Sequence, residues 1–104
     1  MKNVKKILFV FSTLFLMSFS FPSFAKGNLT LYCSVEIEVC ELLIQGFKKD
    51  TGIDVAMTRK SSGETFAQIK AESSNPKGDV WYGGTGDPHL TAAQEGLTEK
   101  YKSK

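Results

Sequence analysis

Apolar and polar residues alternate in two short stretches of the chain, residues 28–33 and 53–60, and a third short stretch, residues 79–82, is apolar enough to be a strand inside a sheet. In the first stretch Leu29 and Leu31 point to one side, and Thr30 and Tyr32 point to the other. Alternation with a period of two predicts β-strands. Each stretch precedes a segment with a helical pattern, and strands that alternate with helices predict a parallel sheet joined by right-handed crossovers. The sequence therefore predicts an α/β fold.

The segments that follow the strands carry apolar residues at helical spacing. In the first segment these residues are Cys40, Leu43, Ile44 and Phe47. They predict the core-facing side of a helix that ends at Gly52, because glycine is suited to the left-handed conformation that follows a helix. In the third segment the residues expected to be buried are Leu90, Ala93 and Leu97.

Residues with short polar side chains stand where these helices should begin. Ser34 can cap the first helix, and Ser61 with Glu64 forms the S-x-x-E pattern of a capping box at the second. Asp87, followed by Pro88, predicts the start of the third helix. Each helix would therefore begin just after a strand has ended, at one edge of the sheet.

The loops at that edge hold the residues that we expect to bind a ligand. Helix N-termini present free N–H groups and attract negative charge, so this edge is suited to a small anion. Two serine hydroxyls beside Arg59 and Lys60 add donors and positive charge, and the glycines after the third strand allow a ligand to approach the backbone. The expected ligand-binding residues are Ser34, Glu36, Ser61, Ser62, Gly63, Gly83, Gly84 and Thr85.

Each of these residues also has a purely structural explanation. Ser34 and Ser61 can serve only as helix caps, and Glu36 can favour a helix N-terminus by its charge alone. The glycine-rich segment 83–86 can be a flexible turn, since it lacks both the spacing of a dinucleotide-binding loop and the lysine of a P-loop. The sequence leaves both explanations open.

The first 25 residues have the pattern of a secretion signal. Three lysines precede an apolar run over residues 7–19, and Ser23 and Ala25 supply the small residues that a signal peptidase needs. We expect cleavage after Ala25, although the run could also serve as an uncleaved anchor. Cleavage would remove three of the 13 basic residues and leave ten against 11 acidic residues, a net charge of −1 that gives no support for nucleic-acid binding.

Cleavage would leave 79 residues, which is short for an independent α/β domain. A chain of this length buries only about 60% of the surface that it exposes when unfolded. Three strands would also leave sheet edges unpaired. We therefore expect one marginal domain or a piece of a larger one, which folds poorly or self-associates on its own.

Cys33, Cys40 and His89 are residue types often used in metal or redox chemistry. The two cysteines would lie in an oxidising compartment, where they either form a disulfide or pack as two small buried side chains. His89 is expected at the surface, and no further metal ligands stand near it in a suitable pattern. Because a nucleophile with a base is also missing, we expect neither an enzyme nor a cofactor or metal site.

Three segments of the chain together resemble a known family. They read FKKDTGI over residues 47–53, RKSSGE over 59–64 and NPKGDVWYGG over 75–84. In this order they are similar to the N-terminal lobe of family 1 extracellular solute-binding proteins, the periplasmic receptors of ABC importers, in the iron(III)-binding-like branch. The resemblance implies the periplasmic binding protein type II fold, in which two α/β lobes close over one solute and deliver it to a permease in the inner membrane.

The resemblance also bears on the solute. Ferric-binding relatives place a histidine after the first strand and acidic residues or tyrosines after the third, where this chain has Glu36 and then glycines. The serines of segment 61–63 are more in keeping with relatives that bind sugar phosphates, phosphonates or similar anions. We therefore expect residues 26–104 to form part of the N-terminal lobe of a periplasmic receptor for a small anionic solute. The alternatives are ferric iron capture, a truncated chain without transport function, and a small secreted interaction domain.

Overall fold

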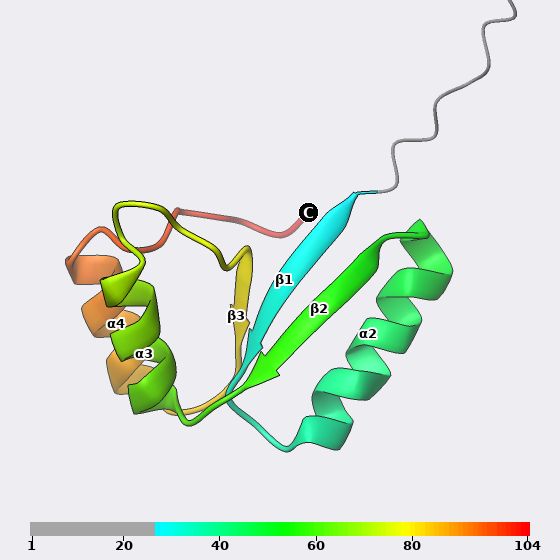
Figure 1. Ribbon diagram of the computed structural model, residues 1–104, viewed down its shortest axis with the longest axis horizontal. Helices are drawn as coiled ribbons and strands as arrows, with labels where there is room; N and C mark the ends of the chain where they lie inside the picture. The colour runs from blue at the N-terminus through cyan, green and yellow to red at the C-terminus, as the bar shows by residue number, and fades with distance from the viewer. Residues whose placement is uncertain (1–26) are drawn as a thin grey trace, which may run out of the picture.

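Three parallel strands form the centre of the molecule, whose computed structural model describes residues 27–104. In sequence order the strands are β1 (Asn28–Cys33), β2 (Asp54–Arg59) and β3 (Val80–Tyr82). β1 lies in the middle and pairs in parallel with β2 on one side and β3 on the other (Figure 1). The predicted parallel sheet is confirmed, and each strand lies within its predicted stretch. The expected leader and its cleavage site fall in residues 1–26, outside the described residues.

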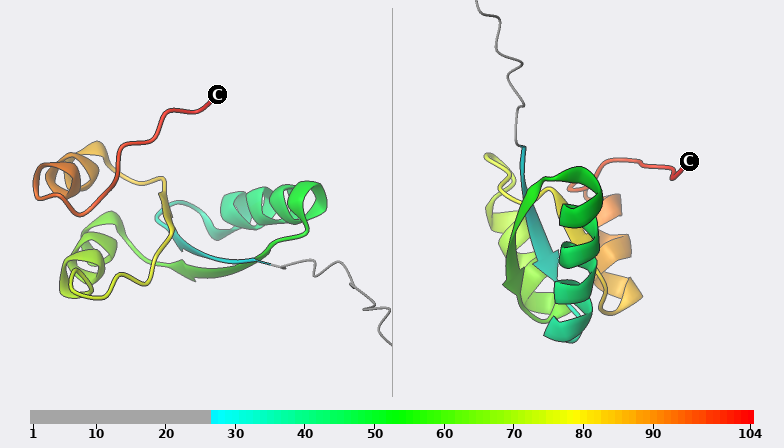
Figure 2. Two further views of the ribbon diagram at one scale, coloured as in Figure 1. Left: turned by 90° about the horizontal axis from the view of Figure 1, so that it is seen from above. Right: turned by 90° about the vertical axis from the view of Figure 1, so that its right-hand side faces the viewer.

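Helices cover both faces of the sheet (Figure 2). α2 (Ile37–Thr51) links β1 to β2 on one face, whereas α3 (Ser62–Ala71) and α4 (Gly86–Gln94) pack together on the other. The chain steps outward from β1 to β2 and then returns across β1 to β3, so crossovers of the same hand place their helices on opposite faces. The winding therefore reverses between β1 and β3, and such a reversal is the switch point where open α/β sheets bind ligands. None of the helices within residues 27–104 is long and apolar enough to cross a membrane.

Two helix ends are formed as the sequence predicted. Ser61 caps α3, because its Oγ accepts a hydrogen bond of 3.3 Å from the Glu64 N–H. The last residue of α2 is Thr51, and Gly52 follows it. Gly52 has a φ of 72° and donates its N–H to the Lys48 carbonyl. Short-range sequence signals are therefore sufficient to fix these two boundaries.

The other two helix starts differ from the prediction. α2 is preceded by Glu36, which makes no capping hydrogen bond, so the predicted cap at Ser34 is wrong. α4 begins after Thr85, so the predicted cap at Asp87 is also wrong, and both Asp87 and Pro88 lie in the first turn. Proline is tolerated there because its missing N–H would have no partner within the helix. The hydroxyl of Ser34 bonds instead to side chains from other elements, as described below.

The face toward α2 holds the apolar core. Leu31 and Cys33 of β1 are buried together with Cys40 of α2, and the two cysteines form a disulfide. Of the two explanations that the sequence left open for the cysteines, the structure therefore supports the bridge, which joins the end of β1 to α2. The partly buried residues that pack around this core are Leu29, Val35, Ile44, Val55 and Met57.

The core on this face is open toward β3. α2 packs mainly against β2, so Val80 and Tyr82 on the same face are 44% and 42% exposed, and Leu43 of α2 is 46% exposed. Between these residues lies a groove of about 260 Å³ with an almost wholly apolar lining, which we call the α2 groove. Its lining includes Leu29, Leu31, Leu43, Ile44, Val80 and Tyr82. The predicted apolar stripe of α2 thus faces the sheet but is only partly covered.

α4 meets the sheet through a different side from the one that the sequence predicted. Ala92 is fully buried, whereas Leu90 is 63% exposed and Ala93 is also exposed. The ring of His89 stacks on Trp81 of β3, and Ala92 follows three residues later on the same side of the helix. This aromatic contact sets the rotation of α4, so the predicted burial of Leu90 and Ala93 is wrong.

Candidate functional site

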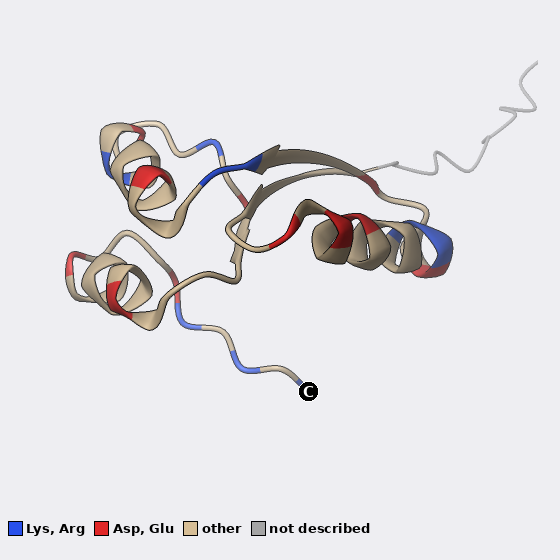
Figure 3. Cartoon of the chain, turned by 90° about the horizontal axis from the view of Figure 1, so that it is seen from below, with Lys and Arg blue, Asp and Glu red and all other residues tan. Residues whose placement is uncertain are grey.

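The loops that follow the three strands meet at the edge of the sheet onto which Figure 3 looks. Gly84 has a φ of 88°, and a Cβ atom on it would collide with the Ser62 Oγ and stand 2.9 Å from the Ser34 Cβ. The Thr85 N–H donates a hydrogen bond of 2.9 Å to the same Ser62 Oγ. Glycine is therefore needed at position 84 both for its backbone conformation and for the approach of the loops. We call this meeting of Ser34, Ser62, Gly84 and Thr85 the loop junction.

The remaining expected residues lie at different distances from the junction. Gly83, with a φ of 79°, packs so closely on Val35 of the first loop that a side chain at position 83 would clash with it. Ser61 and Gly63 flank Ser62 at the start of α3 and are exposed. Glu36 is exposed at the start of α2, and its side chain has no hydrogen bond or ion pair with the other two loops among the interactions found in residues 27–104. The fold thus gathers all of the expected residues except Glu36 around one point.

Ser34 is the buried residue of the loop junction, and its hydrogen bonds connect the three loops. Its Oγ accepts a hydrogen bond of 2.9 Å from Trp81 Nε1 and lies 3.1 Å from Thr65 Oγ1 in a further hydrogen bond. Its backbone N–H donates to the Tyr82 carbonyl at 2.9 Å. Ser34 is buried and Thr65 is 1% exposed, so one hydroxyl joins the end of β1 to both α3 and β3. No prediction from the sequence covered Thr65. The one signal for it is its position three residues after Ser62, which puts both residues on the same side of α3.

The start of α3 presents hydrogen-bond donors to solvent at the junction. Ser61 Oγ accepts from the Glu64 N–H and Ser62 Oγ accepts from the Thr85 N–H, and these bonds leave each hydroxyl hydrogen available for donation. The N–H groups of Ser62 and Gly63 belong to the first turn, where the helix itself supplies no acceptor. Because the helix dipole also places partial positive charge at this end, the arrangement favours an anion.

Two cations lie where β2 passes into α3, the blue part of the ribbon at that point in Figure 3. Arg59 is exposed, and its Nε donates a hydrogen bond of 3.0 Å to the Val35 carbonyl of the first loop. Lys60 is directed toward α3, where its Nζ donates to Gln68 Oε1 at 2.8 Å. Arg59 is thus the cation that stays at the edge with the loops.

His89 supports the glycine loop from α4. Its ring lies 3.7 Å from the Trp81 ring, centroid to centroid, and its Nε2 is 2.8 Å from the Gly83 carbonyl oxygen. Because a carbonyl can only accept, this hydrogen bond requires the proton on Nε2. The expectation that His89 is a surface residue is wrong, since the ring is half-buried between β3 and the loop. No local sequence pattern predicts the contact between Trp81 and His89, which are eight positions apart.

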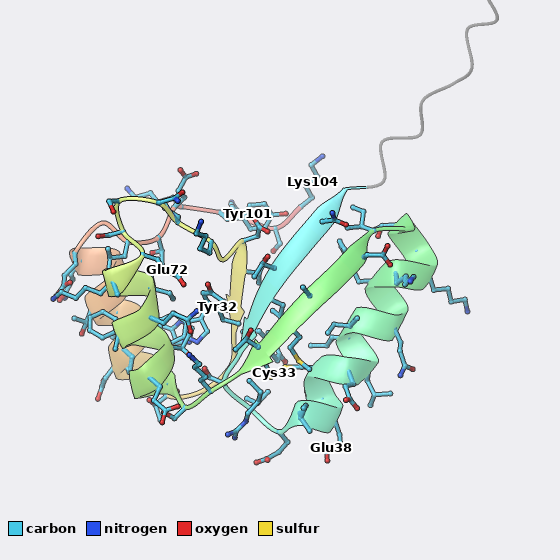
Figure 4. The ribbon with its side chains drawn as sticks, in the orientation of Figure 1. Tyr32, Cys33, Glu38, Glu72, Tyr101 and Lys104 are labelled. Carbon is cyan, nitrogen blue, oxygen red and sulfur yellow. A yellow bond between two sulfur atoms is a disulfide. The ribbon has the colours of Figure 1, made fainter. Side chains whose placement is uncertain are left out.

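A polar cluster braces α3 against β1, and Figure 4 shows Tyr32 and Glu72 directed toward each other across this space. The Tyr32 hydroxyl donates to Glu72 Oε2 at 2.7 Å, and Gln68 Nε2 donates to Glu72 Oε1 at 2.9 Å. These two donors lower the pKa of Glu72, with Gln68 the larger cause. Burial, and then the hydrogen bond to Glu72, raises the pKa of Tyr32.

The described part of the chain contains no group of three or more His, Cys, Asp or Glu side chains placed to hold a metal ion.

Comparison with known proteins relates this sequence to one relative over most of its described length. No protein-family profile matches the chain. The chain is 46% identical to an uncharacterized protein of Haemophilus influenzae over 80 residues, which are 77% of this chain and 23% of that protein.

Solved structures of periplasmic binding proteins share its fold. P5PA matches with a TM-score of 0.72 and 45% identity over 74% of this chain and 24% of its own. AfuA from Actinobacillus pleuropneumoniae, solved with exogenous fructose-6-phosphate bound, matches with a TM-score of 0.73 and 44% identity over 76% of this chain and 25% of its own. Iron-bound HitA from Pseudomonas aeruginosa matches with a TM-score of 0.71 and 28% identity over 73% of this chain and 25% of its own.

These similarities confirm the resemblance that the sequence motifs carried. The chain is related in sequence and fold to the periplasmic binding proteins of the iron(III)-binding-like family. It spans about a quarter of the length of the proteins that it matches.

Proposed function

We propose that the chain forms part of a periplasmic receptor for an ABC importer and binds a small anion of the phosphate-ester or phosphonate type. The observation that carries the proposal is the set of hydrogen-bond donors gathered at the loop junction. Hydroxyl groups of Ser61 and Ser62, the N-terminal N–H groups of α3 and the exposed Arg59 all favour negative charge at one place. Open α/β sheets bind ligands at this edge.

The expected site residues take different roles in this proposal. Ser61 and Ser62 donate their hydroxyl hydrogens, and Gly63 donates its N–H. Gly83 and Gly84 leave room above the backbone, while Thr85 fixes the position of Ser62. Ser34 positions the loops rather than touching the solute, because its hydroxyl is buried and already bonded to two side chains. Glu36, at the rim, would accept hydrogen bonds from hydroxyl groups of a sugar-like solute.

Two of the matched structures indicate the ligand class. AfuA, which holds fructose-6-phosphate, shares 44% of its matched residues with this chain, whereas iron-bound HitA shares 28%. The chain shares more of its matched residues with AfuA than with HitA, which supports AfuA as the guide to the solute. A phosphate ester is therefore favoured over ferric ion.

The proposed organisation follows from the same family. Residues 1–25 would act as a cleaved leader, and residues 26–104 would form part of the first solute-binding lobe. The solute would then be delivered to a permease in the inner membrane, and the chain itself would carry out no catalysis. HitA is the specific observation in favour of the second candidate, which is ferric iron binding.

Calorimetry can decide between the two solutes. Residues 27–104 are joined to the part of AfuA that lies outside the match, and the fusion is titrated with fructose-6-phosphate and with ferric ion. We expect the phosphate ester to bind more tightly. Replacing both Ser61 and Ser62 with alanine removes two hydrogen bonds to a charged group, each worth about 1.5–3 kcal/mol, so affinity should fall at least about tenfold. Tight ferric binding that is unchanged in the double variant would assign the site to iron.

A further inference from the structure

The peptide group between Gly83 and Gly84 lies in the glycine loop, and α4 holds one side of it. The Gly83 carbonyl oxygen is 2.8 Å from His89 Nε2, which donates a hydrogen bond to it. This peptide is trans, and the C=O and N–H groups of a trans peptide point in opposite directions. The Gly84 N–H therefore points away from His89.

The Gly84 N–H is an available donor at the loop junction. Gly84 is exposed, and among the hydrogen bonds found in residues 27–104 none has this N–H as its donor. The next N–H along the chain, that of Thr85, already donates to Ser62 Oγ. Since Gly84 packs directly against Ser62, its N–H adds a donor close to the hydroxyl of that serine.

The two glycines do not fix this orientation by themselves. Gly83 and Gly84 have φ values of 79° and 88°, and glycine adopts positive and negative φ about equally well. The peptide between them can therefore turn over at little cost in backbone energy. A reversed peptide would present its carbonyl oxygen where the N–H now stands, and a carbonyl can only accept a hydrogen bond, so it offers nothing to an anion.

His89 is itself held in place by Trp81. The two rings stack with their centroids 3.7 Å apart and an interplanar angle of 23°. Trp81 Nε1 donates to the buried Ser34 Oγ, so the stack is tied to the first loop. A ring without nitrogen could also stack on Trp81, whereas the Gly83 carbonyl requires a donor at this position. The hydrogen bond is therefore the part of the contact that needs histidine.

We propose that His89 is a positioning residue of the solute site. Its hydrogen bond to the Gly83 carbonyl directs the Gly84 N–H toward the anion, beside the hydroxyl groups at the start of α3. His89 itself does not touch the solute, because its Nε2 is bonded to the loop and its ring faces Trp81. This role rests on the proposed function and brings α4 into a site that the three loops alone had defined.

Two substitutions separate the hydrogen bond from the stack. His89→Gln keeps a donor and loses the ring, because Nε2 of glutamine stands as many bonds from the backbone as Nε2 of histidine. His89→Phe keeps a ring on Trp81 and loses the donor. Leu90→Ala is the control on the same helix, since Leu90 is 63% exposed.

The orientation of the peptide is measured first, on the isotope-labelled full chain without solute. Residual dipolar couplings report the direction of the Gly84 N–H relative to the rest of the fold. We expect His89→Gln and Leu90→Ala to keep the coupling of the unaltered chain, and His89→Phe to change it. A coupling that His89→Phe leaves unchanged would overturn the proposal. Because this measurement needs no solute, it stands even if the proposed function fails.

Affinity is measured next, by titration of the same chains with fructose-6-phosphate. Loss of one hydrogen bond to a charged group should lower the affinity of His89→Phe at least about tenfold, whereas His89→Gln should stay within about threefold of the unaltered chain. Urea unfolding should not follow this order, because phenylalanine keeps the aromatic stack and glutamine does not.

Two results of the titration bear on different claims. Affinity that falls in step with stability in both variants would show that His89 supports only the fold, and it would overturn the proposal. Absence of binding by the unaltered chain would count against the proposed function, and the couplings of Gly84 would then decide whether His89 orients the loop.

Discussion

On the face of the sheet toward α3 and α4 the aromatic side chains of β1 and β3 have hydrogen-bonding and stacking partners, whereas on the face toward α2 the apolar side chains of β3 are exposed. On the first face Tyr32 and Trp81 are held by hydrogen bonds to Glu72 and Ser34, and His89 covers the Trp81 ring. On the second face the apolar residues of β3 are exposed beside the α2 groove. Both faces belong to the same three strands, so the difference comes from what covers them.

This contrast follows from the physics of the two kinds of surface. Buried polar groups need specific partners, and within residues 27–104 no buried side-chain nitrogen or oxygen lacks one. These partners come from other loops and helices of this chain, 40 residues away for Tyr32 and Glu72 and 47 residues away for Trp81 and Ser34. Apolar surface does not need specific partners, because the hydrophobic effect is non-directional. The free-energy cost of leaving it exposed grows with the apolar area that contacts water. The loop edge is therefore specified within residues 27–104, while apolar side chains of β3 stay exposed there.

The largest effect is expected at the loop junction, from Gly84→Ala. The added methyl group would meet Ser62 and Ser34, and the left-handed backbone adds about 1–2 kcal/mol. Overpacking contributes a further ~1–3 kcal/mol. Gly63→Ala is the control, because open space surrounds Gly63 and alanine favours a helix. Urea unfolding, with trimethylamine N-oxide present to support a marginal fold, measures both. Equal stability of the two variants would mean that the junction is not closely packed.

Loss of the disulfide comes next and weakens the face toward α2. The bridge spans seven positions, and a loop of this size constrains the unfolded chain by about 2–3 kcal/mol. Cys33→Ser with Cys40→Ser should lower the free energy of unfolding by about that amount, as measured in urea. The hydrogen exchange of the Tyr32 and Trp81 region should change less than that of α2. An equal change in hydrogen exchange on both faces would mean that the disulfide stabilises the whole fold and not mainly the face toward α2.

The dependence of stability on pH should report on the polar cluster that joins Tyr32, Gln68 and Glu72. The lowered pKa of Glu72 contributes stability above the ordinary glutamate pKa, and this contribution is lost as the pH falls through the lowered value. The raised pKa of Tyr32 contributes stability below the ordinary tyrosine pKa, and this is lost as the pH rises through the raised value. Tyr32→Phe should abolish the alkaline loss and reduce the acid loss, measured as urea midpoints against pH. An unchanged profile would show that the cluster does not stabilise the fold.

The smallest effect is expected in the α2 groove. Leu43 is only half-buried, so Leu43→Ala in the chain alone should cost less than about 1 kcal/mol, against about 2–5 kcal/mol for a fully buried leucine. Leu31→Ala, in the closed part of the same core, serves as the comparison in the same urea experiment. A cost at Leu43 that equals the cost at Leu31 would mean that the groove is already filled in solution.

Local patterns in the sequence were sufficient for the strands and for two helix ends. Alternation placed β1 and β2, a short apolar run placed β3, and Ser61 and Gly52 marked the ends of α3 and α2. Ser34 and Asp87 are also residue types that cap helices, and neither caps one here. The difference lies in tertiary contacts, because the hydroxyl of Ser34 is used by Trp81 and Thr65.

The candidate site was predictable in its loops but not in its supports. That the three loops share one edge follows from a parallel sheet, and the glycines at positions 83 and 84 indicated close approach. The strand order, which sets the switch point between β1 and β3, has no signal in a single sequence. The stacking of His89 on Trp81 and the burial of Thr65 depend on how α3 and α4 rotate, which only packing decides.

Binding of an anion at the loop junction is tested most directly by NMR on the isotope-labelled chain. Fructose-6-phosphate is added in the millimolar range while the amide shifts of residues 27–104 are followed. We predict saturable shifts that centre on Ser62, Gly63, Gly84 and Thr85, with affinity at least about tenfold weaker when Ser61 and Ser62 are both alanine. Saturable shifts that lie elsewhere, or shifts at the junction that the double variant leaves unchanged, would contradict it.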